Sequence, residues 1–455
     1  MMYRKTLALL ICLAGAAFSC TAGAKTLIVN NGMTAAADTN VGTTAAPYRT
    51  ISAAVKVAQP GDIVTVMAGT YTELTSASDV AKLGIQVREV GTASSPVMIQ
   101  AQTPGSVIIN QNSKGVGFEI MNSSYVTISG FVIENCYGGG IHMEEGAPSS
   151  NMVVENNTVN HCDGVAGDNV GGIYIGGCVN CTITNNNIND IKVGGVYYEN
   201  GAGIHGYSQS NCTLSNNQIT NAYTGIFHKR SSGKIGLLIT NNVISNVTLG
   251  IVYSVGGAGD PPHEDQRVYN NIINASNYGI YAVVYETSSP SQGLFIQHNV
   301  FLGSAGITEW GYDGVVVQDN IFYNLTADAI DTQKGTWKQE LTTMSNNLFY
   351  TGGAFWLQQY GTGAANYTSV AAFLAATGFP STNKVANPMF VAPASSNYQL
   401  ASGSPAIGAA HDGTNIGAYP TGKEVVGLLS GPTSVSSTGT TTTVTPDPPS
   451  NVTVE

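Results

Sequence analysis

Side chains that can transfer protons or contact sugars follow a recurring Gly-Ile pair in the middle of the chain. The pair occurs in GGGIH (138–142), GGIYI (171–175), GAGIHGY (201–207) and TGIFHK (224–229). Because alternate residues of a strand share a face, an inward isoleucine places the next residue and the third residue after it on the outer face. Such side chains serve as general acids and bases, and aromatic rings stack on sugars. The outward candidates are His142, Glu144, Tyr174, His205, Tyr207 and Lys229.

The elements that position these side chains repeat along the chain. An Asn recurs shortly before an apolar residue in runs such as VENNTV (154–159), TNNVI (240–244) and QDNIF (318–322). Successive copies of this Asn lie 21 to 31 residues apart. Each repeat holds short β-type runs between Gly or Asn turns and shows no helical periodicity, which predicts an all-β solenoid, a parallel β-helix. The shared asparagines are Asn157, Asn186, Asn217, Asn242, Asn271, Asn299, Asn320 and Asn347.

The repeated Asn is interpreted as structural. We expect it to adopt the left-handed backbone conformation in each turn and to bond its side-chain amide to the Asn of the next coil. The same alignment stacks Cys136 on Cys162 and Cys181 on Cys212, both pairs pointing inward. Cys178-x-x-Cys181 has no second metal-binding pair after it, so its cysteines are interpreted as buried apolar side chains.

The N-terminal residues have the pattern of a leader sequence. Arg4 and Lys5, an apolar stretch over 7–18 and an Ala-Gly-Ala site at 22–24 predict a signal peptide over 1–24 and a secreted protein, extracellular or periplasmic. The alternative is a lipoprotein signal ending at Cys20, which would attach the protein to the cell surface.

Both ends of the solenoid are expected to be covered. A capping helix is predicted over 50–58, followed by a strand over 63–67. TSVAAFLAATG predicts a second helix, with Ser369 or Thr368 as its N-cap and Gly378 as its stop. The β-helix domain is predicted over 25–422, and the Ser/Thr/Pro-rich segment 423–455 is predicted to be a disordered tail or linker.

The charge balance limits the partners. Charged residues make up 10% of the chain and the formal net charge is −11, which argues against a nucleic-acid surface. After the signal, no apolar run reaches the roughly 20 residues of a membrane span. We expect a monomer, soluble or attached to the cell surface, that meets any anionic ligand through a local cationic site or a metal.

Three parts of the chain together resemble the secreted right-handed parallel β-helix proteins of the pectate-lyase-like superfamily. They are PYRTISAAVKVAQPGDIVTVMAGTY (47–71), the Asn-Asn and Gly-Ile coils, and the NPMFV, NYQL, GSPAIGA and NIGAY runs between 387 and 419. The resemblance covers residues 25–422 and implies a right-handed helix. Polysaccharide lyases, mannuronan C5-epimerases, glycoside hydrolases and adhesins share this fold, so the resemblance alone does not select an activity.

Two local similarities bear on the activity. Lys229 in GIFHKRSSGK resembles the lysine of the lyase group that includes chondroitinase B, although Ser254 stands where that group has an arginine one coil later. DPPHED (260–265) resembles the Asp-Pro-His of mannuronan C5-epimerases but contains an additional proline, and is interpreted as a loop.

These features predict a polysaccharide lyase that cleaves a uronate-containing, acidic glycan by β-elimination. Lys229 is the predicted base, provided that Arg230 and partial burial lower its pKa. His205 and Tyr207, one coil earlier and about 5 Å away, are the next candidates for base and acid. The predicted substrate-binding residues are His142, Tyr174, Arg230 and Glu144.

Other functions remain open at this stage. A C5-epimerase would begin with the same proton abstraction, a hydrolase would need two carboxylates, and a non-catalytic module would bind glycans through the same outer face. Ca²⁺ is the alternative cofactor, held by Glu144, Glu145, Asp163 and Asp168 and bridging a uronate carboxylate.

Overall fold

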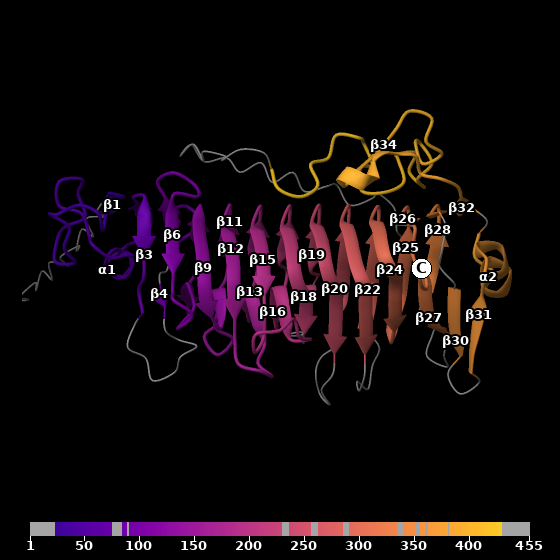
Figure 1. The fold of residues 1–455 in the computed structure, drawn as a ribbon, viewed down its shortest axis with the longest axis horizontal. Coiled ribbons are helices and arrows are strands. Elements are labelled where there is room, and N and C mark those ends of the chain that lie inside the picture. The colour runs from indigo at the N-terminus through magenta and orange to yellow at the C-terminus, as the bar shows by residue number, and fades with distance from the viewer. Residues whose placement is uncertain are drawn as a thin grey trace, which may run out of the picture.

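The strands of the computed structural model wind into a parallel β-helix (Figure 1), as the sequence predicts. The structure describes residues 23–74, 84–88, 91–229, 236–255, 263–284, 291–334, 341–350, 355–359, 363–380 and 382–429. The predicted signal peptide, Arg230 and most of the predicted tail therefore lie outside the described residues. No helix in the described ranges is long and apolar enough to cross a membrane.

Three rows of parallel strands run along the axis of the helix. The first row is a separate sheet of 12 strands in the described part of the chain. It comprises β1 (Thr26–Val29), β2 (Ile63–Val66), β5 (Val97–Ala101), β8 (Val126–Ser129), β11 (Val153–Glu155), β14 (Thr182–Thr184), β17 (Thr213–Ser215), β19 (Leu238–Thr240), β21 (Glu264–Tyr269), β23 (Ser291–Gln297), β25 (Tyr312–Gln318) and β28 (Leu341–Ser345).

The second row follows the Asn turn of each coil. Four of its strands continue around the next corner and join it to the third row. The row comprises β3 (Gly69–Tyr71), β6 (Val107–Asn110), β9 (Phe131–Tyr137), β12 (Thr158–Asp163), β15 (Asn187–Ile191), β18 (Gln218–Lys229), β20 (Val243–Val255), β22 (Ile272–Val284), β24 (Val300–Trp310), β26 (Ile321–Tyr323), β29 (Leu348–Tyr350) and β32 (Lys384–Val385).

The third row carries the Gly-Ile runs. Its members are β4 (Ile85–Val87), β7 (Phe118–Ile120), β10 (Gly139–Met143), β13 (Val170–Gly176), β16 (Gly201–Tyr207), the second halves of β18, β20, β22 and β24, then β27 (Ile330–Lys334), β30 (Phe355–Gln359) and the antiparallel β31 (Gly363–Tyr367). The isoleucine of each run points inward: Ile173, Ile204 and Ile226 stack in register and are almost fully buried. Burying one such side chain stabilises the fold by roughly 1.5–3 kcal/mol.

The two asparagines of each turn have different roles. The second Asn is buried and donates its side-chain amide to the Oδ1 atom of the next coil: Asn217 Nδ2 lies 3.0 Å from Asn242 Oδ1, and Asn242 Nδ2 lies 2.9 Å from Asn271 Oδ1. This ladder confirms the predicted pairing and continues to Asn383. The left-handed conformation, however, falls on the residue before it, such as Asn241 with φ 57°. The prediction that the ladder residue itself is left-handed is wrong.

Helices cover both ends. α1 (Ile51–Val55), capped by Thr50, is shorter than predicted, and β1, which the sequence reading missed, precedes it. α2 (Val370–Thr377) has Ser369 as its N-cap and Gly378 in the left-handed conformation after it, as predicted. The 3₁₀ helix η2 (Pro393–Ser395) and the hairpin of β33 (Phe390–Ala392) and β34 (Asn397–Leu400) lie beside the coils (Figure 1).

After this hairpin the chain returns along the turns. The side chain of Asn346 donates to the Ala409 carbonyl, that of Asn216 donates to the Val425 carbonyl, and the Leu429 amide donates to Asn185 Oδ1. Residues 409–429 therefore run over the outer asparagines of the turns from the C-terminal coils toward the N-terminal coils.

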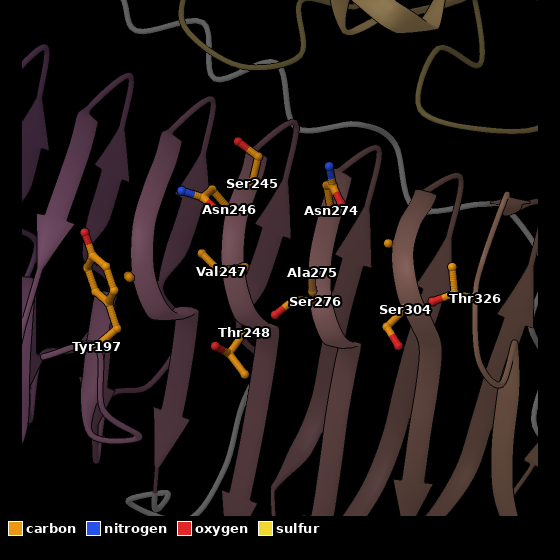
Figure 2. A pocket seen from close by; sticks show the side chains of 12 residues that line it. Tyr197, Ser245, Asn246, Val247, Thr248, Asn274, Ala275, Ser276, Ser304 and Thr326 are labelled. Atoms are coloured by element: carbon orange, nitrogen blue, oxygen red, sulfur yellow. The ribbon is translucent and has the colours of Figure 1, made fainter.

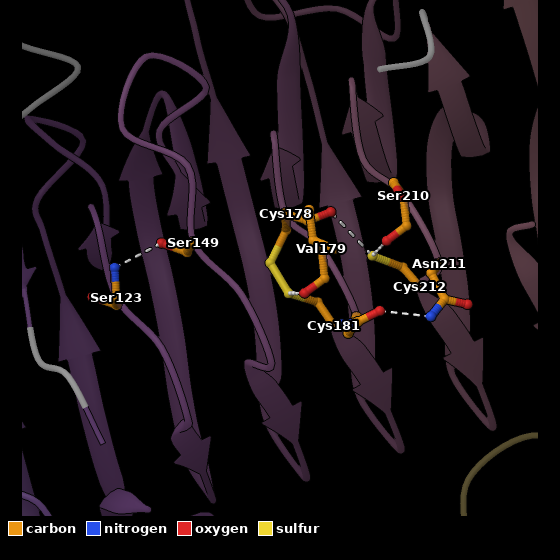
Figure 3. The surroundings of a disulfide bond; sticks show 9 residues. Ser123, Ser149, Cys178, Val179, Cys181, Ser210, Asn211 and Cys212 are labelled. Carbon is orange, nitrogen blue, oxygen red and sulfur yellow. Dashed lines mark hydrogen bonds between the residues drawn. A yellow bond between two sulfur atoms is a disulfide. The ribbon is translucent and has the colours of Figure 1, made fainter. Parts of the chain in front are cut away.

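The cysteines follow the predicted stacking in part. Cys136 lies in register with Cys162, and both are buried. Cys178 and Cys181, however, form a disulfide (Figure 3), so the interpretation of this pair as buried apolar side chains alone is wrong. Cys212 lies in the next coil, and its thiol contacts the Cys178 carbonyl at 3.5 Å.

Replacing Asn242 by Leu should lower the free energy of unfolding by about 1–3 kcal/mol, because the buried amides on both sides lose a partner. Urea denaturation followed by circular dichroism measures the change. Asn366→Leu is the matched control, since Asn366 is exposed on β31. Equal stability of the two variants would contradict the role given to the ladder.

Candidate functional site

A column of rings stands on the outer face of the third row. Parallel pairing places His142 beside Tyr174 and Tyr174 beside His205, as the sequence predicts. Their ring centroids are 4.6 Å and 5.4 Å apart, and Phe227 follows His205 at 4.9 Å. At the other end of the column, Glu119 Oε2 lies 3.1 Å from His142 Nδ1. The strand register thus assembles one continuous stack from four coils.

The expectation that this column faces solvent is wrong for three of its members. His205 is fully buried, and only 7% of Tyr174 and 8% of Phe227 are exposed. The loops 164–169 and 192–200 extend over the column and bond to each other, with the Gly194 amide 2.8 Å from the Gly164 carbonyl. The main chain of Asn200 lies beside the His205 ring. The two loops convert an open strand face into a covered one.

Burial keeps the His205 ring neutral. Desolvation, assisted by the positive charge of Lys229, lowers the pKa of His205 to about 3. Main-chain groups of Asn200 and Val170 beside the ring oppose this effect only in part. Near neutral pH, His205 is therefore an uncharged imidazole, which cannot act as a cationic acid and which forms a wall beneath the loops.

Lys229 and Tyr207 form the second outer column. They are direct partners on β18 and β16, so their backbones lie about 4.8 Å apart. Lys229 is half-buried, and its Nζ atom lies 3.2 Å from Asn169 Oδ1 and 5.8 Å from the centroid of the Phe227 ring. Burial lowers the pKa of Lys229, and the charge of Glu199 partly opposes this effect.

Acidic side chains lie at the upstream end of these columns. Burial and the charges of Glu145, Tyr207 and Glu144 raise the pKa of the Tyr174 phenol well above its usual range. Ser208 Oγ donates to Glu145 Oε1 at 3.2 Å. The Tyr174 phenol therefore stays protonated and is a proton donor near Tyr207.

The four acidic residues predicted to hold Ca²⁺ do not form one ligand group among the described residues. Asp163 Oδ1 accepts hydrogen bonds from the Gly164 and Gly195 amides and thereby fixes the two loops. Glu144 instead lies near Glu119 and His142, and ligand atoms of these three residues lie within 4.8 Å of one another.

A groove of about 650 Å³ extends away from the site along the corner between the second and third rows (Figure 2). It exists because β18, β20, β22 and β24 turn this corner without a loop, whereas the loop 192–200 stands at one end and Thr326 at the other. None of the described residues that line it is charged. The lining residues are Tyr197, Ala222, Ser245, Asn246, Val247, Thr248, Asn274, Ala275, Ser276, Gly303, Ser304 and Thr326.

Sequence reasoning missed several residues of this region. Asn169, Glu199 and Tyr197 lie on loops that interrupt the repeat, and the repeat pattern contains no signal for them. Glu119 precedes the recognised repeats, but it occupies the His142 position one coil earlier. Of the predicted residues, the structure gathers Lys229, Tyr207, His205, Tyr174 and His142 on neighbouring strands, and Glu144 directly follows β10.

Sequence comparisons assign the coils to known repeat families. The description "Pel9A-like, right handed beta helix region" matches residues 31–203, and "Right handed beta helix region" matches residues 202–372. No curated protein sequence matches the chain. The two family matches confirm the resemblance to right-handed parallel β-helix proteins of the pectate-lyase-like superfamily.

The structure is similar to several solved structures. Pectate lyase Pel9A is 15% identical, with a TM-score of 0.51, over 87% of this chain and 96% of its own. A rhamnogalacturonan lyase is 16% identical, with a TM-score of 0.44, over 81% and 90%. A mannuronic acid specific family 6 lyase from human gut microbiota is 14% identical, with a TM-score of 0.40, over 67% and 78%. At 15% identity, the likeness to pectate lyase Pel9A shows a shared fold and nothing more.

Lys229 should titrate below the ordinary lysine pKa of about 10.4. Because its charged form is penalised only in the folded state, the free energy of unfolding should rise with pH as this group loses its proton. NMR of ¹³C-methylated lysines measures the pKa. Glu199→Gln should lower the pKa further, whereas Glu264→Gln on β21 should leave it unchanged. A Lys229 pKa at or above the ordinary value would contradict the assigned burial effect.

Proposed function

We propose that this right-handed β-helix protein is a secreted polysaccharide lyase that cleaves a uronate-containing glycan by β-elimination. The observation that carries the proposal is the half-buried Lys229 amine, whose pKa burial lowers, beside Tyr207. Such an amine is a stronger candidate for a general base than a solvated lysine, since more of it is neutral at a given pH. The fold shared with pectate lyase Pel9A and the disulfide, typical of exported proteins, support the proposal.

In the proposed reaction, neutral Lys229 removes the proton at C5 of the uronate. The electron pair forms the C4–C5 double bond as the C4–O4 bond breaks, and the Tyr207 hydroxyl donates a proton to the departing O4. Asn169 Oδ1 orients the amine. His205 does not take the proton in this scheme, because its ring is buried beneath the loops.

Substrate binding is assigned to the residues around this pair. The partly exposed His142 offers a ring surface, and Glu144 offers a hydrogen-bond acceptor for hydroxyl groups. Tyr174 is buried against His142 and supports that ring. Arg230, which follows Lys229 in the sequence, is proposed to neutralise the uronate carboxylate. The groove supplies hydroxyl and amide groups without charge, which fits the hydroxyl groups of sugars further along the chain.

The reaction is tested on pectate, alginate and glycosaminoglycan panels, with and without Ca²⁺. Ultraviolet absorbance and NMR should show 4,5-unsaturated ends, and the rate should rise with pH as Lys229 becomes neutral. Lys229→Ala should reduce the rate by at least roughly 10²-fold, as expected for the loss of a general base. Lys114→Ala removes an exposed lysine in another coil and should leave the rate unchanged.

Other products would select other functions. New reducing ends without unsaturation would indicate a hydrolase, and inversion at C5 without cleavage would indicate an epimerase. Binding without any change in the glycan would indicate a non-catalytic module. Each of these three results would overturn the lyase proposal.

A further inference from the structure

In two coils, the first of the two turn residues is not Asn. His298 and Asp319 stand where neighbouring coils have Asn270 and Asn346, and both keep the left-handed conformation, with φ of 54° and 59°. The two replacements occupy consecutive coils, so their side chains lie next to each other on the outer edge of the turns.

The returning C-terminal segment adds a third residue at this place. The His411 amide donates to Asp319 Oδ1 at 2.9 Å, and His411 Nδ1 contacts Asp319 Oδ2. His298 Nε2 lies 3.4 Å from Asp319 Oδ2. The carboxylate is fully buried and the His298 side chain is 12% exposed. One ligand atom from each residue lies within 4.8 Å of the others.

The hydrogen bond on the far side of His298 determines what can lie between these groups. His298 Nδ1 is 3.2 Å from the Asn415 carbonyl oxygen, which can only accept, so Nδ1 carries a proton. In a neutral ring, Nε2 then presents a lone pair to the carboxylate, and two acceptors face each other. A cation between Nε2 and the carboxylate would remove this conflict.

We propose that His298, Asp319 and His411 bind a divalent transition-metal ion such as Zn²⁺. Zn²⁺ accepts two imidazole nitrogens and a carboxylate oxygen, whereas Ca²⁺ prefers oxygen ligands alone, and water completes the coordination. The bond from His298 Nδ1 to a backbone carbonyl is the usual way in which proteins orient a ligating histidine. The site is independent of the proposed lyase activity.

The site joins two parts of the chain that are far apart in sequence. His298 and Asp319 belong to the coils, whereas His411 belongs to the returning segment, which a bound ion would hold in place. Other bonds already position this segment, since the Gly417 amide donates to the Asp319 carbonyl at 2.8 Å. The metal therefore adds to an existing contact and does not create it.

Zn²⁺ titration of the chelator-treated full-length protein, followed by calorimetry, tests the proposal, and Co²⁺ absorption reports nitrogen ligands. We expect one strong site per chain. His411→Ala should weaken binding by more than roughly 100-fold, since the loss of a ligand's supporting hydrogen bond alone costs about 10–100-fold. Zn²⁺ should also slow proteolysis of the segment 409–429 in the unaltered chain and not in His411→Ala.

His161→Ala is the matched control. His161 occupies the left-handed position of another corner, with φ 54°, and pairs with Asp190, but among the described residues it belongs to no cluster of three possible metal ligands. This variant should bind Zn²⁺ like the unaltered protein. Absence of a strong site, or an unchanged affinity in His411→Ala, would overturn the proposal. The second result would place the ion elsewhere, for example at Glu119, His142 and Glu144.

Discussion

In-register stacking of successive coils is the constraint on which the rest of this structure depends. Each strand lies about 4.8 Å from its counterpart, so a residue and its equivalent one coil later are always neighbours. A single favourable residue type is thereby repeated into a column: isoleucines in the core, amides in the turns and rings on the outer face. Columns, not individual contacts, are the units of packing in this protein.

The turn shows how two adjacent residues of one type can serve different needs. The first Asn accepts a backbone conformation that costs most residues about 1–2 kcal/mol, and the second satisfies buried carbonyl and amide groups. Because the first residue is on the outside, it can change where another part of the molecule lies against it. His298 and Asp319 are such changes, and both lie under the returning segment.

Much of the fold was predictable from the sequence because the repeat reports register directly. The alignment of Gly-Ile runs placed His142, Tyr174 and His205 in one column and Lys229 beside Tyr207, and the structure confirms these pairings. The burial of His205 was not predictable in this way. It depends on two loops that interrupt the repeat, and a repeat pattern contains no information about where an insertion folds.

Two other features were not predicted from the sequence, for related reasons. The Cys178–Cys181 disulfide joins two residues of one corner, whereas the stacking argument considers only partners in different coils. The path of residues 409–429 depends on surface turns formed much earlier in the chain, and their sequence has no periodicity that would indicate it.

The returning path of residues 409–429 changes the way in which the protein is expected to unfold. A solenoid whose coils touch only their neighbours loses structure piecewise, because its stability is a sum of nearest-neighbour terms. Here the bond between Leu429 and Asn185 spans 244 residues of sequence and links the last described part of the chain to a middle coil. Fraying of the C-terminal coils then requires release of a strap anchored several coils upstream. The central coils and the C-terminal end should consequently unfold together, as one cooperative unit.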